Sequence, residues 1–277
     1  MINNYFIKRK GADDIRQLLK GLDSAVFSPE IFAATGFFVI RKAIPAKTIL
    51  EWQSEWEKFY TSNYSSGRTV NKYNPVAFDD ELPPILSAMH QNTSLLDIIE
   101  QAFGPDIALY NQRLVIKDSR SRGPVFLHHD SPYHLGWPIK ASAFVAISPV
   151  TPENGGMIFY PGTHQFGFLG DAGEINPEIL DPNWPTLSPS LDPGDVALMH
   201  SLTWHKSGPH LGGPDRIMAD IIYQPANDPS GNALLRGKWQ TDLFLNKTSL
   251  SNKKLFIRSR SSRLSEMQKQ LDQLESK

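Results

Sequence analysis

The feature that most constrains the fold is a series of short β-rich runs in the second half of the chain. Each run is rich in aromatic and β-branched residues, and clusters of Pro, Gly, Asn and Asp separate the runs. Two such turns are Glu153–Gly156 and Asp192–Asp195. This pattern is typical of an antiparallel β-sandwich or barrel, so we predict a mainly β core over 105–225. The runs are IALYNQRLVIK, PVFLHHD, ASAFVAISPV, GGMIFYP, DVALMH and RIMADIIYQP.

The first part of the chain predicts helices instead. Residues 12–60 carry helical signals, among them the Ser-Pro-Glu helix start at 28–30 and apolar residues at helical spacing in 45–60. Residues 85–104 predict further helix, and the polar stretch 61–84 predicts either a loop over an active site or a connector. We predict one domain over 1–277, with a mostly helical flank (1–104), the β core (105–225) containing a surface insertion (166–191), and a C-terminal extension (226–277) ending in a solvated helix (253–277).

Composition narrows the possible functions. The chain has no cysteine, which excludes disulfides, thiolate metal ligands and a cysteine nucleophile. A net charge of -1 gives no overall attraction to nucleic acid. The N-terminus lacks the apolar segment of a signal peptide, and no stretch approaches the ~18 apolar residues of a membrane span. We therefore expect a cytoplasmic protein. As an alternative to a solvated helix, the basic segment 253–277 would form a patch for anionic substrate or lipid headgroups.

Three histidines and an aspartate lie within seven positions, at His128, His129, Asp130 and His134. If residues 124–130 form a strand, alternation places His128 and Asp130 on one face and His129 on the other. A His-x-Asp pair on one strand face can bind one metal ion, whereas His134 lies beyond the strand and its direction is not fixed. A catalytic metal site needs a third ligand from a distant strand. The candidates are His200, His205 and His210.

A cation stands at the start of a predicted inner strand. Arg216 opens the apolar run RIMADIIYQ, and a buried arginine needs a carboxylate partner. Asp215 and Asp220 could serve as that partner. A bound dicarboxylate would also satisfy the guanidinium.

The order of these residues resembles the phytanoyl-CoA dioxygenase family. His128-His129-Asp130 resembles its His-x-Asp motif, and the segment from Trp204 to Pro209 resembles its late His-Gly-Ser-x-Pro motif, with Lys206 in place of the usual small residue. This resemblance selects His205 as the third ligand and leaves His200 as a neighbour of the metal site or a packed core histidine. The turns Glu153-Asn154-Gly155-Gly156 and Pro161-Gly162-Thr163-His164 resemble two further motifs of the family.

The resemblance implies a fold and a chemistry. The fold would be a double-stranded β-helix, a jelly-roll or cupin-like core with helical N-terminal and C-terminal segments. Its members use Fe(II), O2 and 2-oxoglutarate, and convert the last to succinate and CO2 while they hydroxylate an unactivated C–H. Because related halogenases lack the carboxylate ligand, Asp130 favours hydroxylation. The implied iron ligands are His128, Asp130 and His205, and the implied co-substrate contacts are Arg216, Lys117, Tyr133 and Ser207.

Two other classes of function remain open from the sequence. A different jelly-roll metal enzyme, such as a zinc hydrolase or a cupin-type isomerase, would use the same three ligands without needing Arg216. A binding protein that lost catalysis is disfavoured by the intact ligand set. For the oxygenase, we expect a small-molecule or glycan-type polar substrate. Arg68 and Lys72 in the stretch 61–84 would suit an anionic polar substrate better than a bare hydrocarbon. One sub-resemblance, to hydroxylases of the Kdo sugar of lipopolysaccharide, fits the ligand spacing and the basic segment 253–277.

Overall fold

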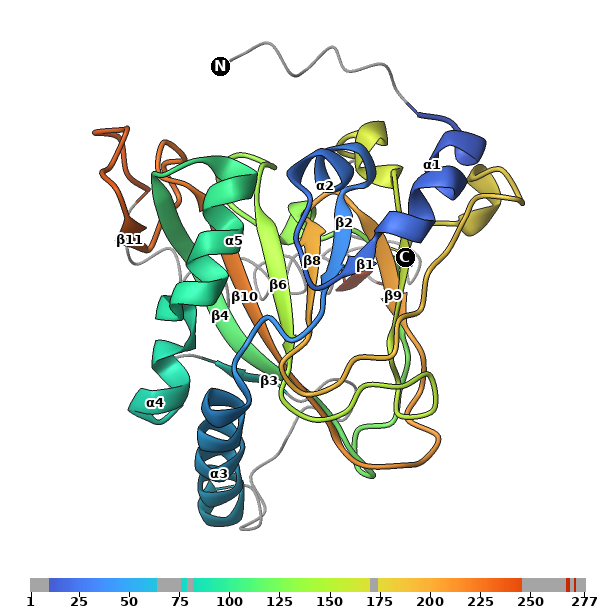
Figure 1. The fold of residues 1–277 in the computed structure, drawn as a ribbon. Coiled ribbons are helices and arrows are strands. Elements are labelled where there is room, and N and C mark those ends of the chain that lie inside the picture. The colour runs from blue at the N-terminus through green and yellow to red at the C-terminus, as the bar shows by residue number, and fades with distance from the viewer. Residues whose placement is uncertain are drawn as a thin grey trace.

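The computed structural model describes residues 10–63, 76–78, 82–169, 174–245, 268, 269 and 272 (Figure 1). In chain order its elements are α1 (Ala12–Leu18), η2 (Leu19–Gly21), β1 (Asp23–Ser24), α2 (Pro29–Thr35), β2 (Phe37–Ile40), α3 (Ala46–Asn63), β3 (Val76–Phe78), α4 (Pro84–Ser87), η4 (Ala88–Gln91), α5 (Thr93–Phe103), β4 (Ile107–Lys117), β5 (Val125–His128), η5 (Ser131–Tyr133), β6 (Ala141–Ala146), β7 (Met157–Tyr160), η6 (Thr163–Phe166), η7 (Pro177–Ile179), β8 (Val196–His200), β9 (Trp204–Ser207), β10 (Arg216–Pro225) and β11 (Ala233–Arg236).

Two sheets form the core. The larger has the order β1-β2-β8-β6-β10-β4-β11, with β3 also paired to β4, and the smaller has the order β5-β9-β7. Among the described residues, every strand pair except β1–β2 is antiparallel. The sheets face each other through side chains such as Phe37 of β2, whose ring stacks on Phe159 of β7 at a centroid distance of 4.1 Å. The prediction of a mainly β, jelly-roll core is confirmed.

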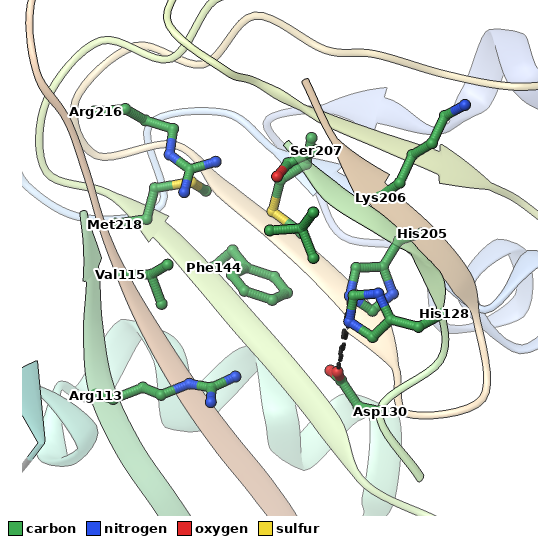
Figure 2. Close-up of a pocket in the computed structure, with 12 residues that line it drawn as sticks. Arg113, Val115, His128, Asp130, Phe144, His205, Lys206, Ser207, Arg216 and Met218 are labelled. Carbon is green, nitrogen blue, oxygen red and sulfur yellow. Dashed lines mark ion pairs between the residues drawn. The ribbon is translucent and has the colours of Figure 1, made fainter. Parts of the chain in front are cut away.

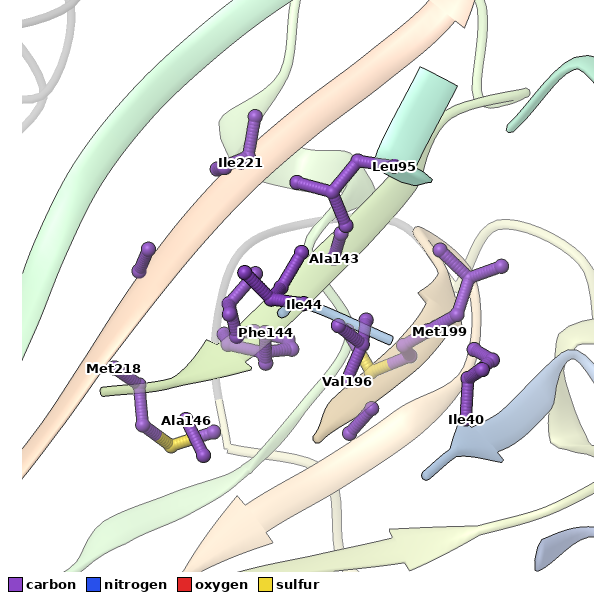
Figure 3. Close-up of a cluster of buried hydrophobic side chains, with 14 of the residues drawn as sticks. Ile40, Ile44, Leu95, Ala143, Phe144, Ala146, Val196, Met199, Met218 and Ile221 are labelled. Atoms are coloured by element: carbon purple, nitrogen blue, oxygen red, sulfur yellow. The ribbon is translucent and has the colours of Figure 1, made fainter. Parts of the chain in front are cut away.

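The central strands of the larger sheet are buried on both faces. All six residues of β6 are buried, because one face meets the helices and the other lies between the sheets. Figure 3 shows this packing, with Ala143 close to Leu95 of α5 and Ala146 close to its ladder partner Met218. A sheet covered on both faces forms a rigid base for side chains that project from its inner face.

Helix α5 lies along the outer face of β4 and β10, and α4 lies below it in Figure 1. A buried glutamine on β4 attaches them: Gln112 accepts a hydrogen bond from the backbone N–H of His90 at 2.8 Å and donates to the carbonyl of Leu86 at 2.8 Å. The outward-facing Gln112 fixes the register of β4, so its neighbours in sequence point inward.

The helical prediction for residues 12–60 is wrong at 37–40. α2 ends at Gly36, which adopts the left-handed conformation (φ +66°), and a Cβ there would lie 2.5 Å from Thr203 Oγ1. The next four residues, FFVI, form β2 and pair with β8. Aromatic and β-branched side chains favour a strand once a neighbouring strand supplies the hydrogen bonds, and that neighbour lies far away in the sequence.

Three other segments have partial outcomes. Within 61–84, Val76–Phe78 forms β3 at the edge of β4, whereas Arg68 and Lys72 lie outside the described residues. Within 166–191, Leu187 bridges back to Phe159 and Leu191 to Val150, so this stretch rejoins the core. The basic segment 253–277 lies outside the described residues, apart from 268, 269 and 272. The division into one domain remains a prediction.

Candidate metal and co-substrate site

Two histidines meet where β5 pairs with β9. His128 and His205 are directly opposite each other in the antiparallel ladder, and their ring centroids lie 4.3 Å apart. The register shifts between Val125 and His128, which marks a bulge in β5. A bulge re-aims side chains relative to simple alternation, so His128 and Val125 both line the cavity although three positions separate them.

Asp130 completes the cluster from outside the strand. Strand β5 ends at His128, so the predicted strand over 124–130 is wrong at its C-terminal end. Asp130 instead has helical backbone angles (φ -79°, ψ -20°) as the residue before η5. Its Oδ1 lies 3.5 Å from Nε2 of His128 and 3.7 Å from Nε2 of His205. One potential ligand atom from each residue lies within 4.8 Å of the others.

His129 points away from this cluster. Its ring lies 5.9 Å from that of Phe168, and its Nε2 accepts a hydrogen bond from the backbone of Leu169 at 3.4 Å. The expected separation of His129 from His128 and Asp130 is therefore present, although a bulge and a bend produce it rather than regular alternation.

Backbone carbonyls orient both imidazoles. Nδ1 of His128 lies 2.8 Å from the carbonyl oxygen of Phe126, and Nδ1 of His205 lies 3.0 Å from that of Thr203. A carbonyl only accepts, so each Nδ1 donates to the backbone, and each Nε2 faces Asp130. Burial and the neighbouring His128 lower the pKa of His205 to about 4, which keeps it neutral.

The Asp130 carboxylate is ready to bind a cation. Burial alone would raise its pKa, but the neighbouring imidazoles of His205 and His128 hold the pKa well below its usual range. Its Oδ2 is buried and has no hydrogen-bond partner. A buried carboxylate with two imidazole nitrogens beside it is the ligand set of a 2-His-1-carboxylate metal site.

Arg216 faces the same cavity from β10 (Figure 2). The side chain is almost fully buried, its Nη1 donates to the carbonyl of Gly155 at 2.6 Å, and its Nε has no partner. Burial lowers its pKa to about 10, so the guanidinium remains charged. The expected alternative partner Asp220 is bound to Arg113 instead, at 2.7 Å. Among the described residues, Arg216 forms no ion pair with a carboxylate.

The other predicted co-substrate contacts have different positions. Ser207 lines the cavity, and its buried Oγ has no partner. Lys117 is buried beside Arg216 in the ladder, but its ammonium binds backbone carbonyls and does not line the cavity. Tyr133 lies in η5 with its ring 6.1 Å from that of His128. Lys206, which replaces the family's small residue, borders the cavity, and its ammonium extends toward Tyr160, 5.9 Å from the ring centroid (Figure 2).

Sequence reasoning missed Arg113. Its side chain projects from β4 into the cavity on the side opposite His205 (Figure 2), while its Nε and Nη2 both bind Oδ2 of Asp220 at 2.7 Å. Strand alternation predicts its direction, because Arg113, Val115 and Lys117 are two positions apart and therefore lie on one face of β4. Once Lys117 was predicted to face the site, the residue four positions earlier had to face the same way.

The remaining histidines lie away from the cavity. His200 packs against His164 with ring centroids 5.5 Å apart, so it is a packed histidine rather than a neighbour of the candidate metal cluster. Nε2 of His210 lies 3.3 Å from the carbonyl of Pro214. His90 contacts Gln112, and His134 packs on Tyr110.

The matching family agrees with this geometry. The phytanoyl-CoA dioxygenase (PhyH) family matches residues 32–218. This match covers more than half of the chain, and the chain belongs to that family. Its members are Fe(II)/2-oxoglutarate-dependent oxygenases, so this protein is a non-haem iron oxygenase that uses 2-oxoglutarate and O2.

Solved structures share the fold. EctD from S. alaskensis has 17% sequence identity and a TM-score of 0.62, over 80% of this chain and 88% of its own. The non-heme monooxygenase ThoJ has 22% identity and a TM-score of 0.61, over 86% and 97%. The α-ketoglutarate-dependent epimerase SnoN from nogalamycin biosynthesis has 19% identity and a TM-score of 0.60, over 77% and 85%. None of the described helices has the length and apolar character needed to cross a membrane.

Proposed function

We propose that this oxygenase hydroxylates a C–H bond of a small polar substrate, with iron bound by His128, Asp130 and His205. The co-substrate 2-oxoglutarate would be held by Arg216. One observation carries the proposal: a three-residue metal cluster shares a cavity with a buried arginine that lacks a carboxylate partner among the described residues. The arginine needs an anion, and the cluster needs a cation.

The residues present fit both groups. Two imidazoles and one carboxylate leave positions of an octahedral ion open for other ligands. Bound iron and 2-oxoglutarate supply the oxidising chemistry, with succinate and CO2 as products. Arg216 can pair bidentately with the far carboxylate, and the unpartnered Oγ of Ser207 can donate to it. Phe144 and Met218 provide apolar walls that exclude water from the reacting carbon.

The cavity supports a polar substrate. Arg113 is tied to Asp220 through one edge of its guanidinium, and its other edge faces the cavity. The carboxylates of Asp220 and Asp130 raise the pKa of Arg113 and already balance its positive charge. A neutral hydroxyl or carbonyl oxygen therefore suits this edge better than a further anion. A saccharide has such oxygens, and a Kdo-type sugar remains a specific candidate. EctD has been solved with 2-oxoglutarate and 5-hydroxyectoine, which shows a small polar molecule accommodated on this fold.

The second candidate function is weaker. A zinc hydrolase or cupin-type isomerase would account for His128, Asp130 and His205. It would leave Arg216 as a buried charge with no counter-charge, at a cost of several kcal/mol in general. The oxygenase proposal gives that charge a partner.

Titration of the iron-loaded protein with 2-oxoglutarate, without oxygen, tests the proposal. We expect a visible charge-transfer band in the wild type. Loss of one partner of a buried charge pair costs roughly 2–5 kcal/mol, so Arg216→Ala should bind 2-oxoglutarate ~30- to several-thousand-fold more weakly while still binding iron. Arg216→Lys should be intermediate, because an ammonium lacks the bidentate geometry.

Arg122→Ala is the matched control, because Arg122 is exposed and its Nε donates only to the nearby carbonyl of Ser119. It should behave as wild type. Equal affinities of wild type and Arg216→Ala would remove Arg216 from the co-substrate site. The substrate class needs a separate experiment, a screen of saccharides and other polar compounds for stimulated succinate release.

A further inference from the structure

The segment that follows Asp130 ends in a fully buried ion pair. Lys140 directly precedes β6, its ammonium donates to Oδ2 of Asp228, and both side chains are 0% exposed. No other ion pair of the described residues has both side chains so completely buried. Replacing such a pair by apolar side chains is often neutral or stabilising, so stability alone does not account for it. A buried pair can instead select one arrangement of the chain around it.

The chain between residues 135 and 140 is wrapped around the carboxylate of Asp228. Oδ2 of Asp228 also accepts from the backbone N–H of Trp137 at 2.9 Å, and the ammonium of Lys140 also donates to the carbonyl of Trp137 at 2.8 Å. Gly136 has φ +75°, and a Cβ at that position would lie 2.1 Å from Oδ1 of Asp228. The pair therefore holds the backbone on both sides of the peptide at Trp137, and only glycine fits beside it.

Further contacts keep the pair itself in place. The backbone N–H and the hydroxyl of Ser230 donate to Oδ1 of Asp228 at 2.9 and 2.8 Å. The ammonium of Lys140 lies 4.8 Å from the ring centroid of Tyr110, and the hydroxyl of Tyr110 accepts from the backbone N–H of Leu135 at 2.8 Å. The anchor of the segment is thus attached to β4 and to the residues that follow β10.

Both ends of the same segment are tied to Ser201, in the connection between β8 and β9. The carbonyl of Ser201 accepts from the backbone N–H groups of Asp130 and Ser131 at 2.9 and 3.1 Å. The N–H of Ser201 donates to the carbonyl of Lys140 at 2.9 Å, and His205 follows in β9. A displacement of Lys140 is therefore transmitted through Ser201 to the backbone of Asp130.

Asp130 depends on this segment more than the two histidines do. The ladder between β5 and β9 fixes His128 and His205 directly, whereas Asp130 lies outside the strands, before η5. We propose that Lys140 and Asp228 are positioning residues for the metal ion, which they do not touch. Their pair fixes the segment 131–140, and with it the direction of the Asp130 carboxylate. This inference rests on the proposed function, because it requires Asp130 as a metal ligand.

Titration of the metal-free protein with Co(II) tests the proposal. Lys140→Met keeps the apolar stem beside Tyr110 and removes the ammonium that holds Asp228 and Trp137. We expect its Kd for Co(II) to rise about tenfold, because groups that orient a metal ligand contribute about 10- to 100-fold to metal affinity. The visible absorption bands of bound Co(II) should also change, because the carboxylate is no longer held in one position. Wild-type affinity together with wild-type bands would overturn the proposal.

Two further variants separate positioning from stability. In Lys140→Met/Asp228→Asn both charges are gone, so the unfolding temperature should recover relative to Lys140→Met, while Co(II) binding stays weak because the carbonyl of Trp137 still lacks its donor. Recovery of both together would overturn the proposal. If Lys140→Met does not fold, Gly136→Ala takes its place. It keeps both charges and displaces Asp228 from the segment, so it should weaken Co(II) binding and change the bands; wild-type values would again overturn the proposal.

Asp195→Asn is the matched control. Asp195 is also buried and pairs with Arg41, away from the segment 131–140. The control should lower the unfolding temperature and leave the affinity and the bands of Co(II) unchanged. If it alters them as much as Lys140→Met does, metal binding merely follows stability, and the positioning role is wrong.

Asp130→Ala distinguishes a failure of this inference from a failure of the proposed function. If Asp130→Ala binds Co(II) as the wild type does, the proposed metal ligands are wrong, and the proposed function fails with them. If Asp130→Ala loses the metal and Lys140→Met binds it as the wild type does, only the role of Lys140 and Asp228 fails.

Discussion

His128 and His129 are neighbours in the chain with opposite surroundings, which makes them a matched pair of substitutions. We expect His128→Ala to weaken iron binding more than about 100-fold, because even partners outside the ligand shell cost about 10- to 100-fold. His129→Ala should retain iron, because its ring packs on Phe168. Metal content after desalting, with Co(II) as an air-stable probe, measures both variants.

The same measurement extends to the other proposed ligands. Asp130→Ala and His205→Ala should also lose the metal, whereas His200→Ala should keep it, because His200 packs on His164 away from the cavity. Metal loss in His129→Ala or His200→Ala, with retention in His128→Ala, would reassign the ligands. Unfolding temperatures of all variants separate metal loss from misfolding.

The sequence was sufficient to nominate individual site residues but not their partners. His128 and Asp130 follow from spacing, while the choice of His205 over His200 and His210 required the family resemblance. Asp220 was nominated as a partner of Arg216, yet it binds Arg113. Both arginines lie on the inner face, and which of them meets Asp220 depends on the register of β10 on β4. The register between two strands depends on residues far apart in the sequence, and a local sequence pattern does not determine it.

At the scale of elements, the turn Glu153–Gly156 connects β10 to the site. The side chain of Asn154 accepts from the backbone of Thr151 at 2.8 Å and donates to the carbonyls of Pro149 and Pro214, the latter just before Arg216. We expect Asn154→Ala to reduce the free energy of unfolding by roughly 1–3 kcal/mol, because it leaves these buried groups without a partner. Urea unfolding measures this.

Asn154→Ala should also weaken 2-oxoglutarate binding, because Gly155 orients Arg216. The adjacent Glu153→Ala is the control, since Glu153 is exposed and should change stability by no more than about 0.5 kcal/mol. If Asn154→Ala proves as stable as Glu153→Ala, the turn does not hold the start of β10.

The elements themselves were predicted unevenly. The β-rich runs after residue 105 coincide with strands because their composition and their turns agree. FFVI at 37–40 was missed because a preceding helix start at Ser28 favoured continuation, while the pairing of β2 with β8 decides the outcome. The end of β5 was misplaced for a related reason: the bulge before His128 and the bend at Asp130 are properties of the pair β5–β9. Local propensity gives way where tertiary pairing competes with it.

At the scale of the whole molecule, two half-buried histidines, His164 and His200, join the N-terminal flank to both sheets. His164 follows β7, His200 ends β8, and Nε2 of His164 lies 3.1 Å from the carbonyl of Ala33 in α2. Burial lowers the pKa of His164 from 6.5 to about 4, and burial together with His164 lowers that of His200 from 6.5 to about 3. Below about pH 6.5 the unfolded chain therefore binds protons that the folded chain does not.

This difference sets the sign of the acid response. Stability is fully present above pH 6.5 and falls as the pH falls toward the folded pKa values, because protons favour the unfolded chain there. At about pH 5 each histidine is ~1.5 pH units below its unfolded pKa, which corresponds to up to about 2 kcal/mol each. Urea unfolding of the iron-loaded protein at about pH 7 and pH 5 should show a loss of this order.

The double substitution His164→Gln and His200→Gln isolates the pair from His205 and His129, whose pKa values are also lowered. It should reduce the difference in unfolding free energy between the two pH values by up to about 4 kcal/mol, even if it lowers stability at pH 7. The substitutions also change packing, because the ring of His164 lies 2.6 Å from the position that a Cβ of Gly36 would occupy. The free energy of unfolding at pH 7 therefore measures the packing effect, and its change with pH measures the titration of the two histidines. An unchanged slope in the double variant would place the acid sensitivity in His205 and His129 instead of in this junction between the flank and the sheets.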